Sequence, residues 1–278
     1  MAVIYNTLSP TIGHVETIKS KLAGDKNLEI LNWLTTSNYG PQHSDYIKRR
    51  QEGTGQWLLS SPRYQAWRKL GKQTLLCRGI PGAGKTILAS VVIQDLISSY
   101  QQNTGVGIAF IYCNYRLQNQ QKDCDLLCSL LKQLSEQRQA LPDCVKDIFN
   151  KHKTKHTRPS SSEISTNLRS VAAMYSKVFI VVDALDECQV VDGSRKCLLI
   201  EIFNLQTNSN VSFLATSRHI PDIIDNFQDE MQLDVRATEE DIRRYLDGQS
   251  SLLPSFVCES SDLKEEVMVA ILQAVDGM

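Results

Sequence analysis

Apolar and polar positions follow two patterns along this chain. Short, nearly continuous apolar runs cover residues 73–79, 106–115, 177–183, 211–218 and 230–235. Longer segments in which apolar residues recur every three or four positions cover residues 85–100, 123–137, 162–176, 194–206, 238–248 and 262–278. Continuous apolar strands separated by helices are typical of a parallel sheet covered on both faces. The pattern therefore predicts a three-layer α/β domain.

The remaining segments divide the chain into three expected parts. Residues 1–50 form a helical preface with an apolar stripe at 27–34, residues 51–237 form the α/β domain, and residues 238–278 begin a C-terminal helical region. We expect that last region to be truncated, because its final helix has an apolar face with little left to pack against. Thr238 is the expected N-cap of the helix at 238–248.

Two further segments have mixed polarity. Residues 49–67 contain Trp57, Tyr64 and Trp67, which indicates a short helix or turn that packs aromatic side chains onto the domain. Residues 146–162 are basic and polar, and we predict a solvated loop there rather than a nucleic-acid contact. His152 and His156 lie four positions apart in this segment, but an expected loop gives them little support as metal ligands.

One glycine-rich stretch follows the first apolar run and opens the first long helix. Its residues are Gly79, Ile80, Pro81, Gly82, Ala83, Gly84, Lys85 and Thr86, which match the P-loop pattern G-x-x-x-x-G-K-[ST] in full. The loop N–H groups would bind the α- and β-phosphates of a nucleotide. Lys85 would neutralise the β- and γ-phosphate oxygens, and Thr86 would place its hydroxyl on Mg²⁺. With strands numbered along the chain, the expected sheet order is 5-1-4-3-2.

Acidic residues follow the apolar strand at 177–183. Asp183 ends that strand, where the ligand crevice of an open α/β sheet lies, and is the expected carboxylate on the Mg²⁺ side. Asp186 and Glu187 come next and could orient or activate an attacking water. Arg218 ends the neighbouring strand, from which it could reach the γ-phosphate. These three residues are the candidate catalytic and sensing groups.

Composition adds a few exclusions. The chain has 278 residues, 42% of them hydrophobic and 22% charged, with a formal net charge of −1, so nothing indicates a nucleic-acid or anionic-membrane partner. We expect no signal peptide and no membrane-spanning helix, because no uncharged apolar run reaches about 18 residues. The eight scattered cysteines indicate reduced thiols in a cytoplasmic protein. Cys124 and Cys128 lack partners for a metal site.

Four alternatives to an ATPase switch are considered. A guanine-specific protein would need N-K-x-D, whereas residues 150–153 read NKHK, so adenine is favoured. An AAA+ motor usually has a glutamate directly after the metal-side aspartate, where this chain has Ala184. A P-loop kinase and a catalytically inert scaffold for protein assembly complete the alternatives.

Together these residues resemble the NACHT class of STAND nucleotide-switch ATPases. The resemblance rests on three features: the P-loop GIPGAGKT, the small Ala184 before the Asp186–Glu187 pair, and the strand end Thr216-Ser217-Arg218. The segments ILNWL, RRQEGTGQWLL and IYCNYRLQNQ look like fungal NACHT proteins, also classed as nephrocystin-3-like N-terminal domains. The resemblance covers roughly residues 28–278.

The resemblance implies an ATP/ADP-binding, Mg²⁺-dependent signalling and oligomerisation switch with slow ATP hydrolysis. It places Thr54 and Gly55, with Trp57, against the adenine and ribose. It also implies a cytoplasmic fungal NOD-like receptor of innate recognition or incompatibility. Such a receptor forms homo-oligomers through this module and has an N-terminal effector domain and C-terminal repeats outside this segment.

Overall fold

The computed structural model describes residues 24–116, 123–189, 193–227, 230–249, 257 and 260–275. Its centre is one sheet of five parallel strands, whose bounds are β1 Thr74–Arg78, β2 Val106–Tyr112, β3 Lys177–Asp183, β4 Val211–Ser217 and β5 Met231–Asp234. Their spatial order is β2-β3-β4-β1-β5, which confirms the predicted order 5-1-4-3-2 read from the opposite edge. The architecture is that of a P-loop NTPase.

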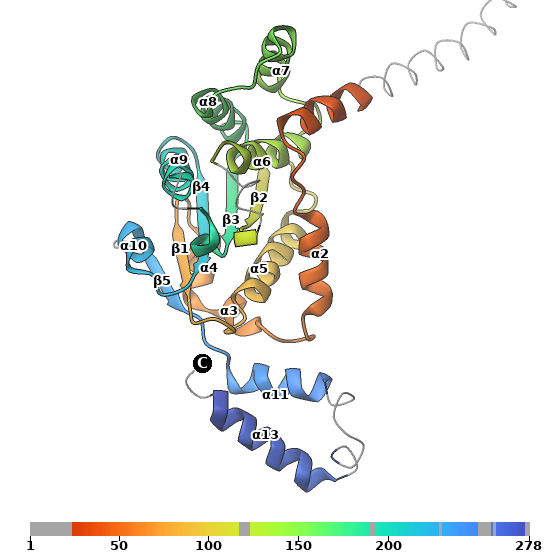
Figure 1. Cartoon of the computed structure of the whole chain (residues 1–278), viewed down its shortest axis with the longest axis vertical. Coiled ribbons are helices and arrows are strands. Elements are labelled where there is room, and N and C mark those ends of the chain that lie inside the picture. The colour runs from red at the N-terminus through yellow and green to blue at the C-terminus, as the bar shows by residue number, and fades with distance from the viewer. Residues whose placement is uncertain are drawn as a thin grey trace, which may run out of the picture.

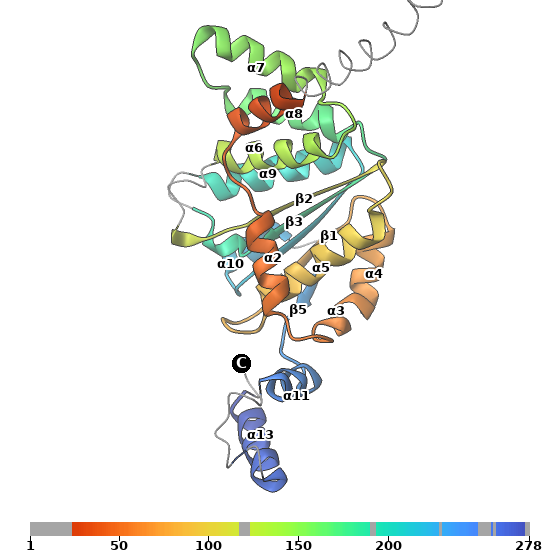
Figure 2. The same ribbon diagram turned by 90° about the vertical axis from the view of Figure 1, so that its right-hand side faces the viewer.

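Helices cover both faces of this sheet, as predicted (Figures 1 and 2). Besides a helical segment at residues 24–34, they are α2 Gly40–Arg49, α3 Gln56–Ser60, α4 Pro62–Lys69, α5 Lys85–Tyr100, α6 Asp123–Glu136, α7 Asp143–Lys155, α8 Ser161–Ala172, α9 Ser194–Asn208, α10 Pro221–Ile224, α11 Glu239–Gly248 and α13 Ser261–Val275. Two 3₁₀ turns, η2 Leu185–Glu187 and η3 Asp225–Phe227, follow β3 and α10. One face carries α4 and α5, with α2 packed against α5, and the other carries α6, α8 and α9 with α7 outermost (Figure 2).

The core lies on either side of the central strands. Apolar residues of β3 and β4 are fully or almost fully buried, because helices cover both faces of these strands. Trp67 of α4 is also fully buried, and its indole Nε1–H donates to the Phe213 carbonyl at 2.9 Å. Tyr64 lies beside it with a ring-centroid distance of 5.5 Å. The prediction that residues 49–67 pack aromatic side chains onto the domain is thus confirmed. None of the helices in the described ranges is both long and apolar enough to cross a membrane.

The predicted loop at residues 146–162 is wrong over its first half, where α7 extends to Lys155. The lysines of this segment obscure an apolar stripe at Val145, Ile148 and Phe149, which is buried. These positions follow the three- and four-residue spacing of a helix face. Trp33 packs edge-on against Phe149, with ring centroids 5.2 Å apart. The basic residues occupy the outer face of an ordinary amphipathic helix.

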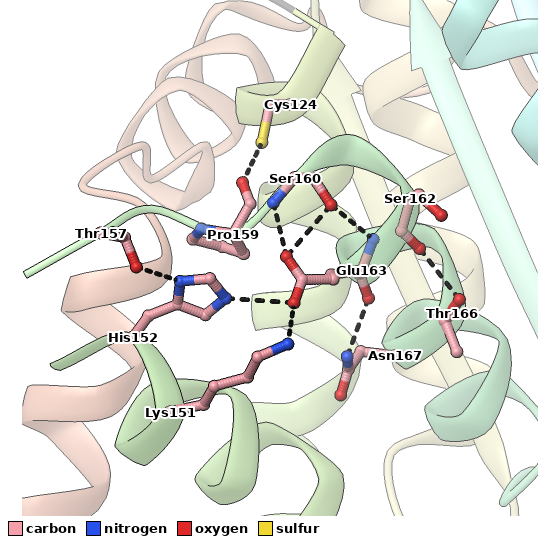
Figure 3. A network of polar contacts seen from close by, with 10 residues as sticks. All are labelled: Cys124, Lys151, His152, Thr157, Pro159, Ser160, Ser162, Glu163, Thr166 and Asn167. Carbon is pink, nitrogen blue, oxygen red and sulfur yellow. Dashed lines mark hydrogen bonds and ion pairs between the residues drawn. The ribbon is translucent and has the colours of Figure 1, made fainter. Parts of the chain in front are cut away.

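A polar network joins α7 to α8 (Figure 3). The Glu163 carboxylate accepts from Lys151 Nζ at 2.5 Å and from the Ser160 N–H at 2.9 Å, and Ser160 caps α8 in return. His152 contacts Glu163 through Nε2 at 3.2 Å and Thr157 through Nδ1 at 2.7 Å. Lys151 and the Ser160 amide hold the pKa of Glu163 down to about 2. Both ring nitrogens of His152 are therefore used in contacts that join α7 to the start of α8.

Two glutamines of the α6 region cover the open edge of β2. Gln133 accepts from the Phe110 N–H at 3.0 Å and donates to the Phe110 carbonyl at 2.8 Å. Gln137 does the same to Ile108, at 2.9 Å and 2.6 Å. Each side-chain amide thus replaces one residue of a neighbouring strand. Pairing of these edge groups protects the sheet against addition of a foreign strand.

Candidate functional site

The P-loop connects β1 to α5, and its glycines are required by its geometry. A Cβ at Gly79 would lie 2.5 Å from the Val235 carbonyl oxygen, so the loop can pass β5 this closely only without a side chain. Gly82 and Gly84 have φ values of +85° and +83°, in the left-handed region that favours glycine. The loop therefore presents bare backbone at the start of α5, where helix N–H groups attract anions.

Lys85 lies in the first turn of α5 and folds back over the loop. Its Nζ donates to the carbonyls of Gly79 and Ile80 at 2.9 Å and 2.8 Å. Partial burial lowers the pKa of Lys85, against the opposing effect of Asp186 and Asp183. A cation held this way stands ready to exchange carbonyl oxygens for stronger anionic acceptors.

Asp183 is buried at the end of β3, with 2% of its surface exposed. The Thr216 hydroxyl donates to Asp183 Oδ1 at 2.6 Å and accepts the Ala184 N–H at 2.9 Å. Burial raises the pKa of Asp183 to about 6, although hydrogen bonds from Thr216 and Thr86 and the charge of Lys85 favour the carboxylate. A carboxylate and a hydroxyl from Thr86 are hard oxygen ligands of the kind that suits Mg²⁺. This donor set fits the cation predicted from the sequence.

The chain turns sharply after Asp183. Ala184 has φ +53° and ψ +49°, a left-handed conformation that is uncommon for a residue with a side chain. This turn starts η2 and directs Asp186 toward Arg218 of the next strand. Asp186 Oδ2 accepts from Arg218 Nε at 2.5 Å, and Oδ1 accepts from the Arg218 N–H at 3.1 Å. The ion pair raises the pKa of Arg218.

Glu187 points to the other side of the same turn. Its Oε2 accepts the N–H of Tyr115, just beyond β2, at 3.2 Å. The Asp186 side chain is 3% exposed, whereas that of Arg218 is 50% exposed. Both candidate catalytic carboxylates thus accept hydrogen bonds from the protein, Asp186 from Arg218 and Glu187 from the Tyr115 N–H.

Most of these residues line one polar cavity of about 380 Å³. Its walls are Pro81, Gly82, Gly84, Lys85, Thr86, Ile87, Asp183, Ala184, Asp186, Glu187, Thr216 and Arg218. The structure therefore brings the P-loop, the metal-side pair and the catalytic candidates together. We refer to this space as the polar cavity.

A second, mainly apolar cavity of about 410 Å³ lies on the other side of the P-loop. Its lining includes Thr54, Gly55, Trp57, Ile87 and Leu88. The two cavities share Gly82, Gly84 and Ile87. The C-terminal helices contribute a further wall, made of Asp241, Ile242, Tyr245, Leu246 and Ile271. The lining is completed by Arg236 and Ala237, which precede α11, and by Arg49, Arg50, Gln51 and Ala83. We refer to this space as the apolar cavity. Its lining contains Thr54, Gly55 and Trp57, the residues expected to contact the adenine and ribose.

Sequence reasoning missed two residues of this site. The sequence predicts Thr216 only as part of a strand end, although its hydroxyl joins Asp183 to Ala184. The sequence gives no role to Asp241, yet it accepts the Gly55 N–H and the Trp57 indole N–H. The available signal for the first is a threonine at the end of an apolar strand. No local signal marks the second, because its partners are far away in sequence.

The remaining candidates are structural. Cys124 and Cys128 have Sγ atoms 3.9 Å apart, and no disulfide joins the cysteines within the described ranges. Cys258 lies outside the described residues. His156 is the C-cap of α7 and has a left-handed conformation. Over the residues that the structure describes, no group of histidine, cysteine and carboxylate side chains forms a further metal site.

Comparison with solved structures finds distant similarity. The Aeropyrum pernix ORC1 protein in complex with DNA shares 17% identity, with 73% of this chain and 53% of that one covered and a TM-score of 0.45. The Walker-type ATPase paby2304 of Pyrococcus abyssi shares 14% identity over 78% and 64% of the chains, with a TM-score of 0.47. This chain thus spans between half and two thirds of those proteins. No curated protein matches it in sequence.

The family comparison covers the site itself. The model of the nephrocystin 3 N-terminal family matches residues 53–218, which is more than half of the chain. The matched segment starts at the glycine before Thr54, contains the P-loop and Asp183, and ends at Arg218. It stops before α11. The chain belongs to the nephrocystin 3 N-terminal family, as a NACHT-like P-loop NTPase.

Proposed function

We propose that this protein binds ATP or ADP together with Mg²⁺ and hydrolyses ATP slowly. The observation that carries the proposal is the pair of cavities that meet at the P-loop. One is mainly apolar and of a size for a nucleoside, and the other holds a lysine, a buried carboxylate and the start of a helix. A nucleoside polyphosphate has the same division into an apolar and an anionic half.

The P-loop backbone and the polar side chains of the polar cavity each have a role in this proposal. The P-loop backbone and Lys85 bind the phosphates, and Lys85 exchanges its carbonyl partners for phosphate oxygens. Thr86 and Asp183 hold Mg²⁺, which would neutralise charge on the phosphates when bound. Thr216 keeps Asp183 in position. Arg218 contacts the γ-phosphate after leaving Asp186. The ion pair between Arg218 and Asp186 therefore breaks when ATP binds and stays intact when ADP binds.

Hydrolysis requires a group that orients the attacking water, and a carboxylate can do this. Asp186 and Glu187 lie on the wall of the polar cavity, within reach of a water at the γ-phosphate. Release of Arg218 from Asp186 would free the first, and release of the Tyr115 amide would free the second. Turnover is expected to be slow because either carboxylate must give up its protein contact before it can act on a water.

A catalytically inert scaffold is the second candidate. The contacts of Asp186 with Arg218 and of Glu187 with Tyr115 favour it, because they occupy both carboxylates. Measured ATP turnover by the purified chain separates the two candidates. Turnover above that of a Lys85→Ala control supports the ATPase, whereas binding without turnover supports the scaffold.

Within the parent protein we propose a signalling and oligomerisation switch in the cytoplasm, with effector and repeat domains outside this segment. The NACHT-like family membership supports this. A nucleic-acid partner is not proposed, since Lys146, Lys151 and Lys153 of α7 each pair with a carboxylate. Sedimentation of the full-length protein with ADP and with a non-hydrolysable ATP analogue tests the switch. An oligomer that depends on the nucleotide supports it, and identical assemblies contradict it.

A further inference from the structure

Helix α11 is attached to the loop that precedes α3. The Asp241 carboxylate, in the first turn of α11, accepts the Gly55 N–H at 3.0 Å and 3.1 Å and the Trp57 Nε1–H at 3.1 Å. Arg244, one turn later, donates to the Gly53 carbonyl at 2.6 Å. Thr238 caps the helix and accepts the Asp241 N–H. A single carboxylate thus holds two donors of a segment that is remote in sequence.

The segment held by Asp241 has little freedom to move. Gly55 has φ +76°, and a Cβ there would lie 2.9 Å from Leu88 of α5. Arg50 holds the same peptide group from its carbonyl side, because its guanidinium donates twice to the Thr54 carbonyl, at 2.9 Å and 2.6 Å. Thr54 and Gly55 are therefore positioned between Arg50 and Asp241.

The apolar cavity depends on this attachment. Thr54 and Gly55 lie on one wall, whereas Ile242 and Leu246 of α11 and Ile271 of α13 lie on another. Figure 1 shows α11 beside α3, at the end of the domain from which β5 leads into the C-terminal helices. The cavity would lose the wall formed by these residues if α11 moved away. The family match ends before this wall, at Arg218.

We propose that Asp241 is a positioning residue that couples the docking of α11 to occupancy of the apolar cavity by the nucleoside of the bound nucleotide. The inference rests on the proposed function, since it needs a nucleotide that spans both cavities. A nucleoside in the cavity adds contacts between the two walls and stabilises the docked helix. A polyphosphate without a nucleoside occupies the polar cavity alone and is indifferent to α11.

The test compares two probes, ADP and inorganic tripolyphosphate, each titrated calorimetrically with Mg²⁺. Asp241→Ala removes an ionised acceptor of two hydrogen bonds and should weaken ADP binding about tenfold. Affinity for tripolyphosphate should change by less than about twofold. Asp241→Asn keeps one acceptor oxygen and should recover part of the loss. Glu239→Ala is the matched control, because Glu239 lies in the same turn but pairs with Arg243 of its own helix.

Hydrogen exchange supplies a second readout. ADP should slow amide exchange across α11 in the wild type, and this protection should be reduced in Asp241→Ala. Equal losses for ADP and tripolyphosphate, or unchanged ADP affinity, would overturn the role of Asp241 while leaving nucleotide binding intact. A wild type that binds neither probe would contradict the proposed function, and the coupling with it.

Discussion

The two cavities differ in how the chain builds them. The polar cavity is made by strand ends and the loops directly after them, which parallel strands bring to one edge of the sheet. The apolar cavity is made by three separate parts: the loop before α3, the start of α5, and the C-terminal helices. Under the proposed function, phosphate recognition belongs to the strand ends of the sheet, whereas nucleoside recognition depends on the docking of α11. Substitutions should separate these two contributions.

The largest expected effect is on hydrolysis and lies in the polar cavity. Glu187→Gln or Asp186→Asn should lower ATP turnover by about a hundredfold for whichever carboxylate orients the water, because such groups act mainly in the transition state. Affinity for ATP should stay within about twofold. Single-turnover kinetics with calorimetry measures both quantities. Wild-type turnover in both variants would remove these carboxylates from the mechanism.

The next effect is on binding through the phosphates. Lys85→Ala removes the cation over the P-loop and should weaken ADP, an ATP analogue and tripolyphosphate alike, by at least about tenfold. Calorimetric titration is the measurement, with the exposed Lys69→Ala as the control. A loss confined to the nucleotides would mean that Lys85 does not act on phosphate, and the division between the cavities would fail.

Asp183 gives a prediction that depends on pH. Its pKa is raised to about 6 by burial, so the folded state takes up a proton between about pH 4 and 6 that the unfolded chain does not. The wild type should therefore lose stability as pH rises through this window, by up to about 3 kcal/mol. Asp183→Asn keeps an acceptor for Thr216 and lacks this loss.

Thermal unfolding without nucleotide or Mg²⁺ measures the Asp183 effect. The stability of Asp183→Asn relative to the wild type should increase from pH 4 to pH 7. In titrations at pH 7.5 the same variant should lose most of the Mg²⁺-dependent gain in ADP affinity. A pH-independent difference in stability would show that Asp183 is already ionised throughout this window.

The smallest effect concerns the γ-phosphate. Arg218 is half-exposed and must leave Asp186 to reach a ligand, so its net contribution is modest. Arg218→Ala should weaken an ATP analogue about fivefold and leave ADP within about twofold. Paired titrations with the two nucleotides decide this. Equal losses would make Arg218 a structural partner of Asp186, and no loss would make it a surface residue.

The polar cavity could be predicted because its signals are local. The P-loop is one stretch of eight residues, and Asp183 directly ends an apolar strand. The apolar cavity could not be predicted in the same way. Asp241 lies 184 positions from Trp57 in sequence, and its own helix shows only an ordinary polar first turn. Helix α7 was missed for a different reason, since its charged face outweighs a short apolar stripe in composition.

The central claim is that one nucleotide spans both cavities, and Trp57 allows a direct test. Its indole lines the apolar cavity, whereas Lys85 lies in the polar one. A fluorescence titration with Mg²⁺ and ADP should show a saturable change in the wild type that disappears in Trp57→Phe. In Lys85→Ala the midpoint should move to at least about tenfold higher ADP. An unchanged midpoint in Lys85→Ala would show that the two cavities do not share a ligand and would contradict the account.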